Sequence, residues 1–187
     1  MRDPSRRVVL RAGLGLGLGW PLGSRLPAGQ NDRAALRPAA GDLLIKSGDS
    51  NKTPLTPRDI PAGAAQTMAW AMEPVDRTVR SGSRLNQILL LRLDPETLTP
   101  ETRSRAADGV IAYTSICTHT GCDVDAWLAA EQRLSCPCHD SAFDPKDGGK
   151  VVDGPAPRVL PALPLKVVDG ILVVAKPFTA PIGFEKG

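Results

Sequence analysis

The residues from 117 to 122 read CTHTGC, and the residues from 136 to 143 read CPCHDSAF. Each stretch holds a cysteine and a histidine in close spacing, C-x-H in the first and C-x-x-H in the second. All 4 cysteines and both histidines of the chain lie between Cys117 and His139. Thiolate and imidazole are strong ligands of transition metals. The clustering therefore predicts a metal site formed by two loops whose tips meet.

The composition around these loops is that of a soluble globular protein. Apolar residues make up 42% of the 187 residues and charged residues 23%. Aromatic residues are only 4%, so the core must consist mainly of aliphatic side chains. The chain also contains 18 glycines and 18 prolines, which favour many turns and short strands over long helices. We therefore expect a mainly β, antiparallel fold.

The net charge of +3 is unevenly distributed. Residues 1–29 hold five arginines and a single acidic residue, so the remainder of the chain is close to neutral. A nearly neutral body does not indicate a nucleic-acid-binding surface.

The first 29 residues read as a targeting region. The paired arginines in SRRVVLR (5–11), followed by the glycine-rich AGLGLGLGW (12–20), resemble a twin-arginine export signal. An ordinary secretory signal or a plain basic arm are the alternatives. Only 13 residues separate Arg11 from Arg25, whereas a membrane-spanning helix needs about 20. We expect a periplasmic protein whose signal is cleaved or associates loosely with the membrane.

The rest of the chain divides into a linker at 30–41 and one domain at 42–187. Short strands are expected at 42–46, 65–72, 87–93, 109–115 and 150–152. The segment 100–107 is expected to be a short helix, with Thr99 as N-cap and Pro100 at the first helical position. Asp169-Gly170 lies between two apolar runs, which predicts a hairpin over 164–175 with a type I′ turn.

The two metal-binding motifs resemble the cluster loops of Rieske [2Fe–2S] proteins. The resemblance is specific over residues 117–157 and implies an antiparallel β sandwich or barrel with a cluster-binding subdomain at about 116–158. It implies that Cys117 and Cys136 bind one iron and that His119 and His139 bind the other. The segment 94–108 looks like an insertion, and its charges indicate a solvated face or part of a partner surface.

The remaining pair of cysteines has a counterpart in one branch of this family. Cytochrome bc-type Rieske proteins join the two loops through a disulfide, which implies a Cys122–Cys138 bond here. The Rieske domains of ring-hydroxylating oxygenases usually lack such a pair. The resemblance therefore points to the high-potential branch.

Further residues match, or depart from, the surroundings of the cluster in this family. The sequence Gly154-Pro155-Ala156-Pro157 resembles the proline loop that covers the cluster. Ser141 resembles the serine whose hydroxyl donates a hydrogen bond to a bridging sulfide of the cluster. Such a bond raises the reduction potential. Phe143 stands where the family has a tyrosine, so one such donor is missing. We expect a potential below that of quinol-oxidising relatives and above that of oxygenase-type domains.

The exposed tip also departs from the usual pattern. Thr120 replaces a common leucine and Asp140 a common glycine, and both changes count against quinol docking. The first hypothesis is therefore an electron-transfer subunit of a periplasmic oxidoreductase, similar to the small subunit of arsenite oxidase. It would take electrons from a larger catalytic subunit and pass them to a cytochrome c.

Two alternatives remain open. One is the Rieske subunit of a quinol–cytochrome c oxidoreductase, with a cytochrome subunit and quinol as partners. The other, from a different class, is a zinc-stabilised binding module. None of the three gives the chain a substrate-converting site of its own, because both histidines are already assigned as ligands.

Overall fold

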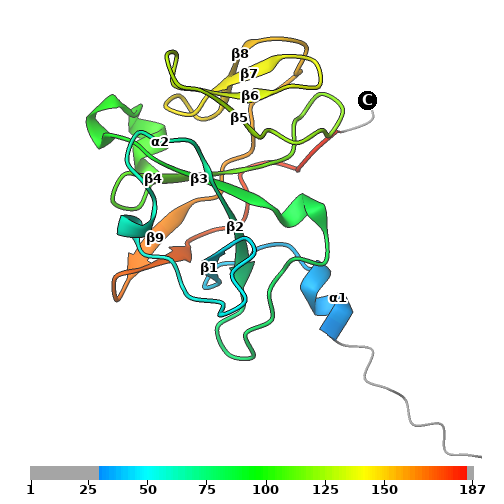
Figure 1. Cartoon of the computed structure of the whole chain (residues 1–187), viewed down its shortest axis with the longest axis vertical. Coiled ribbons are helices and arrows are strands. Elements are labelled where there is room, and N and C mark those ends of the chain that lie inside the picture. Colours follow the sequence, from blue (N-terminus) through cyan, green and yellow to red (C-terminus); the bar gives the residue numbers. More distant parts are fainter. Residues whose placement is uncertain (1–29, 185–187) are drawn as a thin grey trace, which may run out of the picture.

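The computed structural model describes residues 30–184 (Figure 1). The predicted signal region 1–29 lies outside the described residues.

The larger part of the fold is a six-stranded antiparallel sheet with the strand order β4-β3-β2-β1-β10-β9. Its strands, in chain order, are β1 (Leu43–Lys46), β2 (Thr67–Met72), β3 (Ile88–Arg92), β4 (Val110–Thr114), β9 (Leu165–Val168) and β10 (Ile171–Val174). The sheet curls back on itself, because the chain before β9 runs along β4. There Leu163 N donates to Ala112 O at 2.9 Å, and Thr114 N donates to Pro161 O at 3.0 Å.

Aliphatic side chains fill the inside of this sheet, as the low aromatic content predicts. Strand β4 is buried along its whole length, and β3 is buried except at Arg92. Strands buried on both faces are continuous apolar runs rather than alternating ones. Leu44, Ile88, Val110 and Leu172 meet in one cluster between the curled faces.

Two local predictions are confirmed in detail. Asp169 and Gly170 both have positive φ angles, 50° and 80°, as the two central residues of a type I′ turn require. The predicted helix is α2 (Pro100–Ser104), where the Thr99 side chain accepts a hydrogen bond from Thr102 N.

A second, four-stranded sheet lies at one end of the first, with the order β5-β6-β7-β8 (Figure 1). Its strands are β5 (Ala126–Leu128), β6 (Arg133–Cys136), β7 (Ser141–Asp144) and β8 (Lys150–Asp153). Only β8 was anticipated. The other three are four residues or shorter and carry polar or metal-ligand residues, so no alternation of apolar and polar residues marks them.

The two sheets are tied together through the segment 94–108. Thr99 N donates to Lys146 O at 3.0 Å, and Gly148 N donates to Thr102 Oγ1 at 2.8 Å. The buried Tyr113 hydroxyl donates to Pro145 O at 2.8 Å, and burial raises the pKa of this phenol. The insertion is therefore more than the expected solvated face, because its inner side braces the smaller sheet.

The segment expected to be a linker contains a short helix, α1 (Gln30–Ala35). A buried ion pair between Arg80 and Asp42 fixes the chain just beyond it. Among residues 30–184, no helix is long and apolar enough to cross a membrane.

Candidate metal centre

The predicted ligands lie on two loops at the end of the molecule that carries the small sheet. Loop 1 (residues 115–125) joins β4 to β5, and its turn is closed by Cys117 N donating to Cys122 O at 2.8 Å. Loop 2 (residues 137–140) joins β6 to β7. The pairing of Cys136 with Ser141 across these strands sets the width of loop 2.

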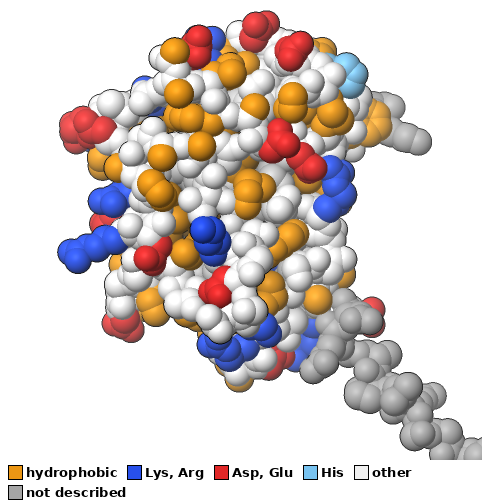
Figure 2. All heavy atoms as spheres, in the orientation of Figure 1, with side chains coloured by type: hydrophobic (Ala, Val, Ile, Leu, Met, Phe, Trp, Pro, Cys, Tyr) orange, Lys and Arg blue, Asp and Glu red, His pale blue; other side chains and the backbone are white. Residues whose placement is uncertain are grey.

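The two histidines are brought together, one from each loop. The ring centroids of His119 and His139 are 4.7 Å apart, with the rings nearly perpendicular. His139 is exposed and His119 is half-buried, and a histidine is visible at the surface of this end of the molecule (Figure 2).

Cys117 and Cys136 are the two free cysteines of the described residues, and both are buried, at 1% and 2% exposure. Burial raises the pKa of the Cys136 thiol to about 11, and the neighbouring Cys117 adds to the effect. A bare thiolate is therefore unfavourable here at neutral pH. A metal cation supplies the positive charge that a buried thiolate needs.

The donor atoms fit a mixed cysteine and histidine site. Nδ1 of His119 is buried and has no hydrogen-bond partner among the described residues. A buried polar atom without a partner is costly, and coordination to a metal would satisfy it. The backbone N–H of His119 also donates to Sγ of Cys117 at 3.5 Å. The two predicted ligand residues of loop 1 therefore lie in one tight turn.

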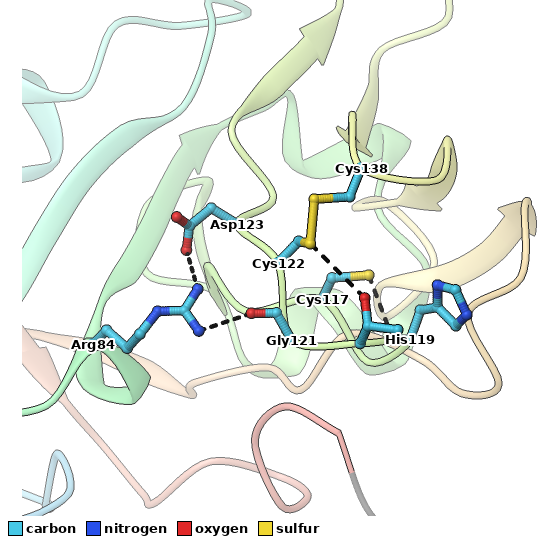
Figure 3. The surroundings of a disulfide bond; sticks show 8 residues. Arg84, Cys117, His119, Gly121, Cys122, Asp123 and Cys138 are labelled. Carbon is cyan, nitrogen blue, oxygen red and sulfur yellow. Dashed lines mark hydrogen bonds and ion pairs between the residues drawn. A yellow bond between two sulfur atoms is a disulfide. The ribbon is translucent and has the colours of Figure 1, made fainter.

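The disulfide between Cys122 and Cys138 is present, as the resemblance implies, with a Cα–Cα distance of 6.4 Å. It joins the two loops next to the predicted ligands (Figure 3). The sulfur atoms of Cys122, Cys136 and Cys138 lie within 4.8 Å of one another. That trio is not itself a metal site, because two of its sulfurs are bonded to each other and only Cys136 can become a thiolate.

The predicted proline loop, residues 154–157, lies against loop 2. Ala156 N donates to Ser141 Oγ at 3.2 Å. This bond leaves the hydroxyl proton of the buried Ser141 available to another acceptor. Phe143 is fully buried in the core between the two sheets.

Contacts that the motifs alone do not reveal hold these loops in place. Thr118 Oγ1 donates to Arg158 O at 2.7 Å, which ties loop 1 to the end of the proline loop. Arg84 donates to Gly121 O at 2.8 Å and pairs with Asp123 Oδ1 at 2.9 Å (Figure 3). Arg84 lies far from loop 1 in sequence, and no motif connects them.

Comparison with known proteins agrees with this geometry. The Rieske [2Fe–2S] domain matches residues 85–164. The chain is 32% identical over 153 residues to the cytochrome bc1 complex Rieske iron-sulfur subunit of Streptomyces lividans, covering 79% of this chain and 89% of that one. It is also 32% identical over 145 residues to the corresponding subunit of Mycobacterium bovis, covering 69% of this chain but only 34% of that protein.

Similar solved structures include the cyanobacterial plasma membrane Rieske protein PetC3 from Synechocystis PCC 6803. It is 24% identical, with a TM-score of 0.38, and the match covers 59% of this chain and 85% of that one. A chain of a hyperthermophilic respiratory Complex III is 25% identical, with a TM-score of 0.40, covering 63% and 70%.

The alternative of a zinc-stabilised module is not supported, since the matching domain binds a [2Fe–2S] cluster. The domain match includes both motifs, the disulfide cysteines and the proline loop. Together with the identity to the Streptomyces lividans subunit over most of its length, it shows that the chain belongs to the Rieske [2Fe–2S] family.

Proposed function

We propose that Cys117 and Cys136 hold one iron of the [2Fe–2S] cluster and that His119 and His139 hold the other. The support is the burial of both free cysteines, the unpartnered Nδ1 of His119 and the closeness of the two imidazoles. Neutral imidazoles in place of two thiolates make the site less negative, which raises its reduction potential.

The cluster supplies reversible storage of one electron. The protein residues decide how that electron is exchanged with a partner. His139 is exposed, so the imidazole edge of loop 2 is where an electron donor or acceptor would approach. Ala156 of the proline loop is buried in the same apolar cluster as Cys117 and Cys136, so it shields the cysteine side of the site from water.

We propose further that the chain is the electron-transfer subunit of a cytochrome bc1-type complex. It would take an electron from quinol and pass it to a c-type cytochrome. The observation that carries this proposal is the identity to a bc1 Rieske subunit over 89% of that protein's length. The loop-joining disulfide, which the family's bc-type branch has, supports it as well.

Copurification tests this assignment. A tagged full chain is expressed in its own host, and detergent-solubilised membranes and the soluble periplasmic fraction are purified separately. Recovery from membranes with b- and c-type haem subunits is the expected result. Recovery from the soluble fraction with one large catalytic subunit and no b-type haem would contradict it.

The polarity of the tip favours a second candidate, the periplasmic oxidoreductase subunit similar to that of arsenite oxidase. Thr120 and Asp140 are both exposed beside the histidines, where an apolar surface would better suit a quinol. Replacing both residues with the family's leucine and glycine discriminates the two. A bc1-type subunit should gain quinol oxidation rate in the double variant, whereas a subunit that never meets quinol should show none in either form.

A further inference from the structure

Arg84 contacts the two residues that flank Cys122 on either side. Its guanidinium donates to the carbonyl of Gly121 at 2.8 Å and to Asp123 Oδ1 at 2.9 Å. Figure 3 shows the guanidinium on one side of this short segment and the disulfide to Cys138 on the other. We propose that Arg84 is a positioning residue for the disulfide, which keeps Cys122 facing Cys138 and so makes the bond resistant to reduction.

The base from which Arg84 reaches loop 1 is rigid. Arg84 begins the 3-10 turn η2 (Arg84–Asn86), and the turn is capped by Ser83, whose side chain accepts from Leu85 N. Asn86 is completely buried, and its amide donates to Leu36 O at 2.7 Å and to Arg80 O at 3.0 Å. The backbone at Arg84 is therefore held by buried hydrogen bonds that do not involve loop 1. From this position, the two bonds of the guanidinium to Gly121 and Asp123 fix the place of loop 1.

The consequence concerns the reduced form of the cysteine pair. Reduction by dithiothreitol breaks the bond between the Cys122 and Cys138 sulfurs. Two electrons and two protons pass to the protein, which gains two thiols, and the reagent becomes a cyclic disulfide. How readily the bond re-forms depends on the effective concentration of one thiol at the other. The two bonds from Arg84 to Gly121 and Asp123, called the clamp below, keep this concentration high if they persist in the dithiol form. The clamp therefore disfavours reduction.

No other contact of the described residues holds both neighbours of Cys122 in this way. Thr118 ties the beginning of loop 1 to Arg158, and Val124 N donates to Ser115 O at the base of the loop. These bonds lie outside the segment 121–123. Without Arg84, and apart from the disulfide itself, that segment keeps its backbone bonds to Cys117 and the contact between Thr120 Oγ1 and Cys122 Sγ at 3.8 Å.

The proposal does not depend on the electron partners proposed above, because it concerns a bond between two residues of this chain. It is tested on the full, cluster-loaded protein in dithiothreitol redox buffers of graded ratio. Free thiols are trapped with an alkylating reagent and counted by mass. For Arg84→Ala, we expect an equilibrium constant for reduction on the order of fivefold larger than in the wild type, given two partly exposed charge-assisted bonds.

Asp123→Ala separates the two bonds of the clamp. It removes the ion pair and leaves the bond to Gly121, so its equilibrium constant should lie between those of the wild type and Arg84→Ala. The double variant should match Arg84→Ala alone, because Asp123 then has no partner left to lose. Arg84→Lys, which retains the charge without the two-pronged geometry, should restore only part of the resistance.

Arg77→Ala is the matched control, because Arg77 also donates to backbone carbonyls, those of Asn51 and Lys52, but in a different loop. It should leave the equilibrium unchanged. An Arg84→Ala protein that is reduced at the same buffer ratio as the wild type overturns the proposal. Equal shifts in Arg84→Ala and Arg77→Ala would overturn it too, because they would trace the effect to general destabilisation.

Discussion

Gly154 and Gly170 have nearly the same positive φ angle but very different surroundings. Their φ angles are +78° and +80°. A Cβ atom on Gly154 would lie 2.5 Å from Cα of Ser141, whereas one on Gly170 would meet nothing within 4 Å. The glycine of the proline loop is therefore required both by its conformation and by the close approach of the loop to β7.

Gly154→Ala should lower the free energy of unfolding by about 2–4 kcal/mol, because strain at positive φ is combined with a steric clash. Gly170→Ala is the control and should cost only about 1 kcal/mol, from strain alone. Chemical denaturation of the two variants and the wild type measures both. Equal losses in the two variants would show that the contact with Ser141 has no part in the effect.

Ser141 lies beneath the proline loop with its hydroxyl proton uncommitted to Ala156. If that proton is donated to a sulfur of the cluster, it stabilises the more negative reduced state. Ser141→Ala should then lower the reduction potential by about 40 mV, the equivalent of about 1 kcal/mol for one electron. Phe143→Tyr is the companion variant and should raise it.

Protein-film voltammetry on the cluster-loaded variants gives the potentials directly. A Ser141→Ala potential equal to that of the wild type would mean that the hydroxyl faces elsewhere.

At this scale, the sequence was informative wherever residue types and spacing carried the chemistry. The disulfide between Cys122 and Cys138 followed from the resemblance of the CTHTGC and CPCHDS motifs and is confirmed. Arg84 could not be found in the same way. Its role depends on contacts across 37 and 39 residues of chain, which no local pattern records.

Among the elements, the strands of the large sheet were predictable because they are short apolar runs bounded by turns, as in β3 and β4, which are buried almost throughout. Strand β9 is largely exposed and was predictable from the Asp-Gly turn that joins it to β10. The strands β5, β6 and β7 were not, because each is short and mixes core residues such as Leu134 and Phe143 with polar and ligand residues, so that no regular alternation marks it. Ser135 and Cys136 end β6, and Ser141 begins β7. Their strand conformation comes from pairing with each other, which is a tertiary effect.

In three turns beside the strands of the six-stranded sheet, an aspartate carboxylate accepts hydrogen bonds from backbone N–H groups. Backbone N–H donors lower the pKa of Asp49, chiefly Thr53, and that of Asp59, chiefly Thr56. Hydrogen bonds from Thr78 lower the pKa of Asp76 to about 2. A lowered pKa in the folded state contributes stability that is present above the unfolded value of about 4 and is lost as the pH falls towards 2.

The free energy of unfolding should therefore fall between pH 4 and pH 2, as the unfolded chain binds more protons than the folded one. Replacing Asp49, Asp59 and Asp76 with asparagine retains an acceptor oxygen but removes the titration. The triple variant should show a smaller fall than the wild type in urea denaturation at pH 2.5 and pH 5. An identical fall in both proteins would mean that these turns do not contribute to the acid sensitivity.

At the scale of the whole molecule, the antiparallel β class could be foreseen from composition and from the family's motifs. The resemblance also implied the cluster-binding subdomain at about 116–158 in which the four-stranded sheet lies. The bracing of that sheet by α2 and Tyr113 could not be foreseen, because it rests on polar contacts between segments that are distant in the chain. The role of residues 94–108 was only half foreseen, since they combine an exposed charged side with a buried bracing side.

The export of the whole protein is predicted from the paired arginines in SRRVVLR (5–11). If Arg6 and Arg7 form a twin-arginine signal, the folded protein crosses the membrane with its cluster already inserted. Replacing both with lysine should abolish export, leaving cluster-loaded protein in the cytoplasm. Fractionation with immunodetection measures this, and normal export of the variant would indicate a different type of signal.

The central claim is that two thiolates bind one iron and two imidazoles bind the other. Pulsed EPR of the reduced, natively matured protein, grown with ¹⁵N-labelled histidine, tests it most directly. We predict two distinct nitrogen couplings, which arise from His119 and His139, and the loss of one coupling in any His119 variant that retains its cluster. A reduced cluster without histidine nitrogen couplings, or a protein that contains zinc and no iron, would contradict the account.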